Sequence, residues 1–304
     1  MTFEDAAREW LRYVIEDRAC KPSTVRSYRS SVEGKLIPVF GPMLVADITP
    51  VHLERWRSTL DVSARTKNKL LVELHGIFRR AQRVYGLTRN PAADVEPLGV
   101  RRKLDLEVLS AEEVRALVRA AENEQDAAIY LTAAFTGLRR GELLALRWRD
   151  VDFAGSVIRV RASYCAGALT TPKSGKVRSV PLAPDVAAVL ALLGQRPAFT
   201  ADDDLVFVGE AGGYLDGSAL RRRFVGAVRR AGLRPIRFHD LRHTFGTQMI
   251  AVADILRVKE WMGHADVQTT MRYLHFVPRP DDARLVAQAF GAAAPATGVL
   301  PVAA

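Results

Sequence analysis

The sequence predicts a mainly α-helical protein with a small antiparallel sheet, an α+β fold in two units. Apolar residues recur at three- and four-residue spacing through most of the first hundred residues, which is the helical period. Two stretches, 157–161 and 177–182, alternate with the period of a strand. Asn90–Pro91 ends the first helical pattern, and the basic segment that follows contains Pro and Gly, which is typical of a linker. We therefore expect a helical unit at 1–95, a linker at 96–108, a second unit at 109–290 and an Ala- and Pro-rich tail at 291–304.

The ends of the helices in the first unit are marked in the sequence. A helix over about 3–17 has a regular apolar stripe, and Pro22-Ser23-Thr24 opens a second helix. The Pro- and Gly-containing loop 37–42 is expected to end that second helix. Thr49 is expected to cap the next helix, with Pro50 in its first position. The longest helix is expected over about 64–85.

The second unit is expected to surround its sheet with helices. Ser110–Glu113 forms a capping box before an apolar helix at 114–121. A further helix at about 127–135 stops at Thr136–Gly137. The two alternating stretches form a small antiparallel sheet with a turn around 172–175, and the rest is again helical.

Composition limits the class of protein. The chain has 304 residues, of which 48% are hydrophobic and 26% charged, as in ordinary soluble proteins with room for two cores. It contains no apolar run of membrane-spanning length, and its first residues do not resemble a signal peptide. Cys20 and Cys165 lack the spacing of a metal site or a disulfide framework. We expect a cytoplasmic protein with no metal, no cofactor and no membrane partner.

The charge points to nucleic acid. The net charge is +10 and the pI is about 9.9, which suits a nucleic-acid binder, although a solvated basic surface is the alternative. Residues 1–104 hold 19 Lys and Arg against 12 Asp and Glu, so most of the excess lies in the first third. The helix at 64–85 carries basic and polar residues at both ends, which could lie against a duplex backbone. These candidate DNA-binding residues are Arg65, Lys67, Asn68, Lys69, Arg79, Arg80 and Arg83.

The segment from His239 to Tyr273 contains the strongest candidates for catalytic side chains. His239 and Arg242 are three residues apart and share a helix face, and His264 and Tyr273 follow. A guanidinium binds two phosphate oxygens, and an imidazole exchanges a proton near neutral pH, so the combination suits phosphoryl transfer. Taken singly, a His-x-x-Arg pair is more often an exposed helix face, and a tyrosine here is more often a core residue.

Four motifs in order give the chain a family resemblance. It resembles the tyrosine recombinases, the integrase family, which implies a helical core-binding, SAM-like DNA-binding domain followed by a catalytic domain. The first unit is also similar to the core-binding domain of phage-type integrases, through Lys21–Tyr28 and Ile37–Gly41. The four motifs are Thr136–Leu143, Pro172–Leu182, His239–His243 and Met262–Gly263–His264 through Tyr273.

The resemblance implies a reaction without metal or nucleotide. A tyrosine hydroxyl attacks a DNA phosphodiester, leaving a 3′-phosphotyrosyl link and a free 5′-hydroxyl, and a second 5′-hydroxyl reverses the step. By motif position Tyr273 is the nucleophile, and Arg139 and Arg242 bind the non-bridging oxygens. Lys173 corresponds to the general acid that protonates the leaving oxygen, although Lys176 lies close enough to leave the register open.

Four further residues correspond to helping positions. His239 matches the acid/base partner of the tyrosine, and His264 matches a residue that hydrogen-bonds the phosphate or steadies the nucleophile. His243 and Glu142 match supporting positions, and Glu142, three residues after Arg139, is placed to orient that guanidinium by an ion pair.

The biological role is less specified. We expect integration or excision of a mobile element, by a homo-tetramer on two double-stranded DNA recombination sites, with a directionality factor as a further candidate partner and a location at the bacterial nucleoid. A Xer-like resolvase of chromosome or plasmid dimers is the nearest alternative. An inert DNA-binding regulator or a type IB topoisomerase-like enzyme are more distant ones. Lambda-type integrases carry a further arm-binding domain, whereas this sequence enters the core-binding module almost at residue 1, which implies either recombination without arm sites or loss of that domain.

Overall fold

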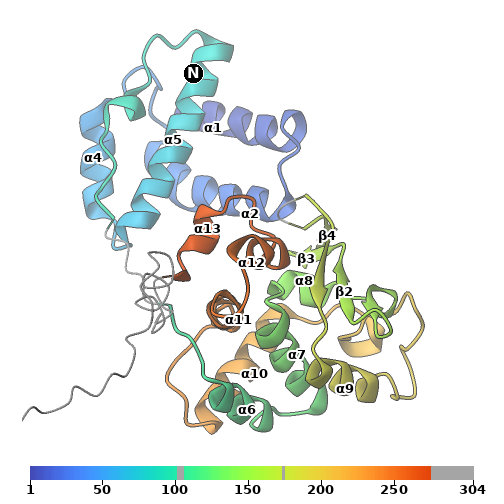
Figure 1. Cartoon of the computed structure of the whole chain (residues 1–304). Coiled ribbons are helices and arrows are strands. Elements are labelled where there is room, and N and C mark those ends of the chain that lie inside the picture. The colour runs from blue at the N-terminus through green and yellow to red at the C-terminus, as the bar shows by residue number, and fades with distance from the viewer. Residues whose placement is uncertain (101–105, 173–174, 275–304) are drawn as a thin grey trace, which may run out of the picture.

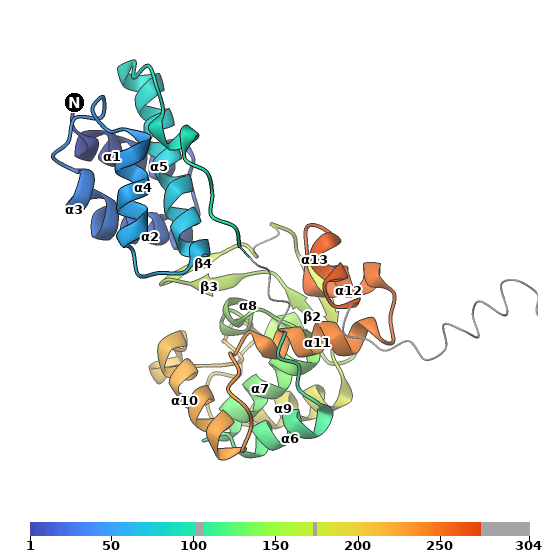
Figure 2. The same ribbon diagram turned by 90° about the vertical axis from the view of Figure 1, so that its left-hand side faces the viewer.

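The computed structural model describes residues 1–100, 106–172 and 175–274. They form two bodies, each around its own cluster of buried apolar side chains (Figures 1 and 2). The first body consists of helices alone among the described residues, and the second surrounds small antiparallel sheets with helices. The predicted fold class, mainly α with a small antiparallel sheet, is confirmed.

The amino-terminal body is built on the contact between its first and longest helices. Its helices are α1 (Phe3–Arg12), α2 (Pro22–Ser31), α3 (Ile37–Phe40), α4 (Pro50–Thr59) and α5 (Ala64–Tyr85). The ring of Phe3 packs against those of Phe40 and Phe78, with centroids 5.6 and 5.7 Å apart. Thr49 caps α4 and α5 spans 64–85, both as predicted.

The predicted loop at 37–42 is wrong in its first part. Helix α2 continues through a π-helical turn at Val32–Leu36 into α3, and the chain leaves helical structure only after Phe40. Leu36 and Phe40 are buried at 0% and 2% exposure, so continued helix keeps both on the core side. Pro38 lies directly after the π-helical turn, at the start of α3, and its missing N–H leaves one helical hydrogen bond unmade without ending the helix.

The second body begins with two helices that pack on each other. They are α6 (Ala111–Arg119), with the predicted capping box at Ser110 and Glu113, and α7 (Glu124–Thr136). Gly137 ends α7 in the left-handed region, with φ +63°, and a Cβ there would lie 2.4 Å from the ring of Phe245. The other helices are α8 (Arg140–Leu144), α9 (Pro184–Leu193), α10 (Gly217–Arg230), α11 (Asp240–Ile250), α12 (Ile255–Met262) and α13 (Gln268–Met271).

The sheets agree with the alternating stretches and add a hairpin. Strand β2 (Val157–Val160) pairs antiparallel with β1 (Val151–Asp152) and with β5 (Arg178–Pro181). A separate hairpin of β3 (Ser163–Cys165) and β4 (Ala168–Thr170) lies between β2 and β5 in sequence. This hairpin was not predicted from the sequence because its strands are short and lack a buried face, whereas Ile158 of β2 and Val180 of β5 are fully buried. Among the described residues, no helix has both the length and the apolar character needed to cross a membrane.

One carboxylate of the first core is left without a good partner. Glu73 on α5 is 2% exposed, and neither of its carboxylate oxygens has a well-aligned hydrogen-bond donor among the described residues. The nearest cation is Lys69, whose Nζ lies 3.4 Å from Oε1. Burial raises the pKa of Glu73 above its ordinary value, with Lys69 opposing that shift.

We therefore expect Glu73→Gln to stabilise the protein at neutral and alkaline pH. Because the folded pKa is raised, the wild-type chain loses stability as pH rises above the unfolded value, and the neutral amide does not. The free energy of unfolding should rise by about 1 kcal/mol near pH 8 and by little near pH 4. Urea denaturation followed by tryptophan fluorescence measures this, with Glu54→Gln at an exposed position of α4 as the control. A variant less stable than wild type at pH 8 would contradict the prediction.

Candidate active site

Arg139 lies where α8 begins. It is the N-cap residue, and its backbone N–H donates to Glu142 Oε2 over 2.8 Å. Its guanidinium donates to Glu142 Oε1 over 2.9 Å and to the carbonyl of Gly263 over 3.0 Å. The side chain keeps 21% of its surface exposed, whereas that of Glu142 keeps none. The ion pair expected from the three-residue spacing is therefore present, and Arg139 still faces outward.

Arg242, on α11, is held almost entirely by backbone. Its guanidinium donates to the carbonyls of Gly137 and Met262, and the residue is only 3% exposed. Burial, and then the charge of Arg139, lower the pKa of Arg242 to about 9. The residue thus remains a cation near neutral pH. Since Met262 and Gly263 are adjacent, α12 holds the guanidinium groups of Arg242 and Arg139 side by side.

Tyr273 is a buried residue with its hydroxyl bonded to a histidine. The residue is 1% exposed, and its Oη lies 3.0 Å from Nδ1 of His243. Burial raises the pKa of Tyr273, while the charges of Arg242, Arg272 and Arg139 oppose that shift. Burial, and then His239, lower the pKa of His243 to about 4. A neutral His243 with its proton on Nε2 accepts a hydrogen bond from the tyrosine hydroxyl.

The other two histidines lie around this pair. His264 contacts Thr270, with Nδ1 2.9 Å from Oγ1, and its ring is parallel to that of Tyr273 with centroids 6.3 Å apart. Burial, and then Arg242 and Arg139, lower the pKa of His264 to about 3. His239 is the N-cap residue of α11 and lies edge-on to His243, with centroids 4.8 Å apart. The histidine bonded to Tyr273 is therefore His243, which the sequence analysis gave only a supporting place.

Lys173 lies outside the described residues, as does its neighbour Ser174. Its assignment as the general acid stays a prediction from the family resemblance. The tail at 291–304 and the end of the second unit at 290 also lie outside the described residues.

The candidate DNA-binding residues on α5 divide into two kinds. Arg80 pairs with Glu9 at 2.7 Å, and Asn68 exchanges hydrogen bonds with the backbone of Leu98. Lys69 donates to Ser27 Oγ over 2.7 Å and approaches Glu73. These three thus have partners within the protein. Arg65, Arg79 and Arg83 are exposed and Lys67 is half-buried, and contact of any of the seven with DNA stays a prediction.

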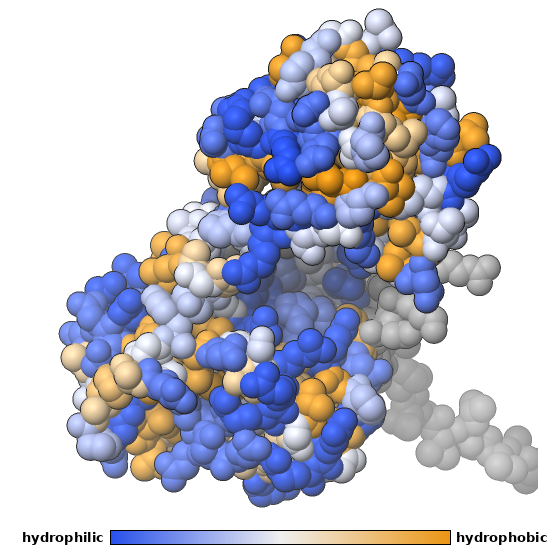
Figure 3. Space-filling view, turned by 180° about the vertical axis from the view of Figure 1, so that it is seen from behind, coloured by the Kyte–Doolittle hydropathy of each residue, from blue (hydrophilic) through white to orange (hydrophobic). Residues whose placement is uncertain are grey.

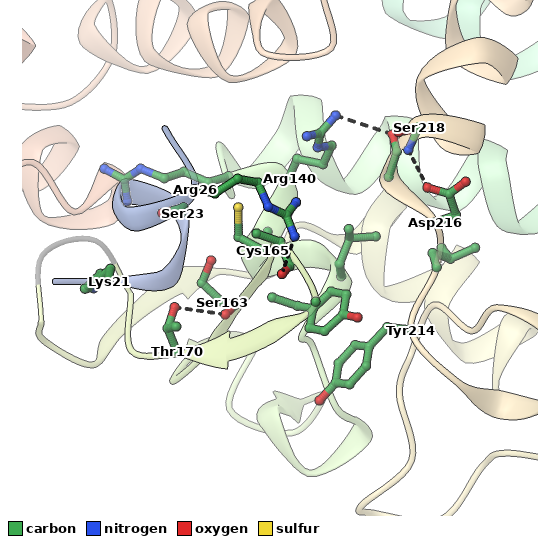
Figure 4. A pocket seen from close by; sticks show the side chains of 18 of the residues that line it. Lys21, Ser23, Arg26, Arg140, Ser163, Cys165, Thr170, Tyr214, Asp216 and Ser218 are labelled. Carbon is green, nitrogen blue, oxygen red and sulfur yellow. Dashed lines mark hydrogen bonds between the residues drawn. The ribbon is translucent and has the colours of Figure 1, made fainter. Parts of the chain in front are cut away.

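A basic surface between the two bodies was not predicted from the sequence. A cleft of about 890 Å³ is lined on one side by Lys21, the residue before α2, and by Arg26 of α2, and on the other by Arg139 and Arg140. Figure 4 shows Lys21, Arg26 and Arg140 around it. Seen from behind, the recess between the bodies is lined by hydrophilic residues (Figure 3).

A hollow of about 580 Å³ lies beside the cleft, along α10. It is lined by four arginines: Arg140, Arg221, Arg222 and Arg229. In the sequence, the run of arginines at Arg221–Arg223 could have indicated this basic surface. Arg223 differs from its neighbours because it pairs with the buried Asp126 at 2.6 Å.

Arg178 was also missed. It lies on β5 with a side chain only 5% exposed and makes a two-fold ion pair with Glu142, at 3.0 and 2.7 Å. The sequence places this arginine at an inward-facing position of an alternating strand, which could have indicated a buried, paired arginine.

Comparison with known proteins identifies the family. Residues 107–278 match the phage integrase family, and residues 2–60 match the SAM-like amino-terminal domain of phage integrases. The first match covers more than half of the chain, so this protein belongs to the phage integrase family of tyrosine recombinases.

Its relatives include both kinds of enzyme that the sequence suggested. A prophage phiRv2 integrase of Mycobacterium tuberculosis is 27% identical, covering 90% of this chain and 74% of the relative. A tyrosine recombinase XerC of Pelobacter propionicus is 30% identical, covering 88% of this chain and 89% of the relative.

Solved structures share the fold. The Tn1549 transposon integrase in complex with transposon right-end DNA has a TM-score of 0.76 at 19% identity, covering 96% of this chain and all of that one. A lambda integrase tetramer bound to a Holliday junction has a TM-score of 0.71 at 18% identity, covering 88% of this chain and 78% of that one.

The buried histidines predict a loss of stability in acid. His243 and His264 take up protons near pH 6.5 when unfolded but resist protonation when folded, so stability is complete above about pH 6.5 and falls toward about pH 4. The variant His243→Asn keeps a hydrogen-bond acceptor near the position of Nδ1, but its side chain does not titrate. The free energy of unfolding should therefore decrease by about 1–2 kcal/mol less between about pH 7 and pH 5 in the variant than in the wild-type protein. Urea denaturation at both pH values measures this. An unchanged pH slope in the variant would show that His243 protonates normally in the folded chain.

Proposed function

We propose that this recombinase cuts DNA by attack of Tyr273 on a phosphodiester held by Arg139 and Arg242. The observation that carries this proposal is that α12 holds the two guanidinium groups on adjacent carbonyls, while His264 and Tyr273 follow directly along the chain. Two fixed cations favour the charge that develops on the non-bridging oxygens during attack. Arg139, which is partly exposed and lines the cleft, is the group that DNA meets first.

The proton of the nucleophile goes to His243 in this proposal. The bond from Tyr273 Oη to phosphorus forms as the bond from phosphorus to the 5′-oxygen breaks, and Nδ1 of His243 takes the phenolic proton. His239, beside His243, is placed to influence its proton affinity. The leaving 5′-oxygen takes a proton from Lys173, as the resemblance implies. A 5′-hydroxyl from another strand then reverses these steps, so the phosphotyrosyl link conserves the energy of the broken bond.

The DNA substrate is proposed to occupy the cleft between the bodies. Lys21 and Arg26 reach it from the first body, and Arg140 with the α10 arginines from the second. We retain the division into a core-binding domain at 1–95, a linker at 96–108 and a catalytic domain at 109–290 as part of this proposal. The α5 residues Arg65, Arg79 and Arg83 would extend the contact.

We further propose that the enzyme integrates or excises a mobile element as a tetramer on two DNA sites. The prophage integrase among its relatives and the tetrameric lambda integrase among its structural neighbours support this. The XerC relative keeps a Xer-like resolvase as the alternative. A directionality factor and a location at the nucleoid belong to the same proposal. Attachment-site repeats beside the gene would favour the mobile-element role, and recombination between two defined duplexes separates a recombinase from a topoisomerase.

We expect Tyr273→Phe to abolish the covalent adduct. A nicked suicide substrate loses its short leaving strand after cleavage, so the wild-type protein is trapped in a denaturant-resistant complex with DNA. Without the hydroxyl no phosphotyrosyl bond forms, whereas DNA affinity stays within about twofold. Tyr130→Phe is the matched control, because Tyr130 is equally buried in the same body and its hydroxyl has no partner among the described residues. An adduct formed by Tyr273→Phe would assign the nucleophile to another residue.

We expect Arg221→Gln and Arg222→Gln to weaken DNA binding in a salt-dependent manner. Each lost phosphate contact reduces the slope of log affinity against log salt by about 1. Fluorescence anisotropy at several salt concentrations measures this for the single variants and the double variant. Arg149→Gln is the control, because Arg149 is exposed, pairs with Asp203 and does not line the hollow. A double variant with the wild-type slope would remove α10 from the DNA-binding surface.

A further inference from the structure

Three arginines are bonded to the end of α12, whereas the proposed phosphate site uses two of them, Arg139 and Arg242. The carbonyls of Lys259 and Glu260 are capped by the N–H groups of His264 and Gly263. The next three carbonyls, of Trp261, Met262 and Gly263, accept from Arg178, Arg242 and Arg139 in that order.

Arg178 cannot serve as a phosphate ligand in this arrangement. Its Nε donates to Trp261 over 2.7 Å, and its two terminal nitrogens both donate to Glu142. All three donor groups therefore have protein partners, and only 5% of the side chain is exposed. What Arg178 contacts is the carboxylate that orients Arg139.

We propose that Arg178 is a positioning residue that keeps Arg139 in place for the phosphate and prevents Glu142 from cancelling its charge. The inference rests on the proposed function of Arg139 and Arg242. Arg178 anchors Glu142 with a two-fold ion pair, and the same carboxylate holds the backbone and the guanidinium of Arg139. Arg178 thus acts on the phosphate through Glu142 and Arg139.

Arg178 also changes the net charge of the site. Arg139 and Arg178 pair with the single carboxylate of Glu142, and Arg242 is bonded to the neighbouring carbonyl of Met262. These four side chains together have a net charge of +2. Without Arg178, Glu142 would cancel the charge of Arg139 and leave a net charge of +1. Burial alone raises the pKa of Glu142, but its bonds to Arg178 and the charges of Arg178 and Arg139 hold that pKa below its ordinary value.

Close packing fixes Arg178 against the end of α12. Gly263 has φ +61°, and a Cβ at that position would lie 3.0 Å from Cδ and Nε of Arg178. The glycine therefore serves both the left-handed helix end and the close approach of Arg178.

The test compares Arg178→Met on two substrates. One is the suicide duplex, and the other carries a methylphosphonate at the scissile position, where a methyl group replaces one non-bridging oxygen and removes the negative charge. On the phosphodiester we expect adduct formation to slow by about 10- to 100-fold, with DNA affinity within about twofold. On the methylphosphonate, the difference in the rate of adduct formation between wild type and Arg178→Met should be several-fold smaller, because less negative charge has to be balanced. The same should hold for Arg139→Ala. A deficit of equal size on both substrates, or no deficit, would overturn the proposal.

A double variant separates charge balance from folding. Glu142→Gln with Arg178→Met removes both members of the buried ion pair, which restores a net charge of +2 and leaves neither member of that pair buried without the other. We expect it to cleave faster than Arg178→Met alone, including where the single variant folds poorly. A double variant no faster than the single one would contradict the charge argument. Arg159→Met is the matched control, since Arg159 pairs with Asp152 on the neighbouring strands and touches neither Glu142 nor α12.

A measurement without DNA keeps this inference apart from the proposed function. Phosphorus NMR titration with inorganic phosphate should show tighter binding by the wild-type protein than by Arg178→Met. Equal binding would overturn the role of Arg178 whether or not DNA is cleaved. A wild-type chain that binds phosphate in this manner but forms no adduct would instead contradict the proposed function alone.

Discussion

The carbonyl end of α12 is the constraint on which the candidate site depends. A helix leaves its last carbonyls without intrahelical donors, and buried carbonyls must find others. Here three consecutive carbonyls each accept from one arginine, and these arginines lie at the start of α8, on β5 and on α11. The negative end of the helix dipole favours those cations. Segments more than a hundred residues apart in the chain thereby acquire fixed positions relative to one another.

This arrangement makes the site complementary to an anion before any substrate arrives. Burying guanidinium groups is unfavourable, and burial, followed by repulsion from Arg139, lowers the pKa of Arg242. The carbonyls and Glu142 offset part of that cost but leave an excess of positive charge. A phosphodiester bound beside Arg139, as proposed, would relieve the repulsion, and the relief would grow as charge develops on the phosphorus oxygens. Burial, and then the charge of Arg242, also lower the pKa values of His264 and His239, so both histidines favour the neutral form.

The sequence predicted the long helices and the order of the motifs because these depend on local rules. Periodicity and caps define α5 and α6, and Glu142 follows Arg139 at the spacing of a helical ion pair. The partner of Tyr273 could not be predicted in this way. His239 and His243 are one helical turn apart, so either could face a tyrosine that approaches from α13, and the choice depends on tertiary packing. Arg178 was missed for the same reason, since its partners lie on α8 and α12.

The contact between the two bodies has a different physical character from the site. Lys21 donates to the carbonyls of Thr171 and Pro172, and Arg26 donates to that of Ala166 in the β3–β4 turn. These bonds join a cationic helix to a polar hairpin, and the two apolar clusters remain separate. Exposed charged side chains exchange protein carbonyls for water or phosphate at little cost in free energy. The bodies therefore can separate without exposing either core, and a duplex with its row of phosphates competes directly for Lys21 and Arg26. The groups that hold the cleft closed are thus the same groups that would bind DNA within it.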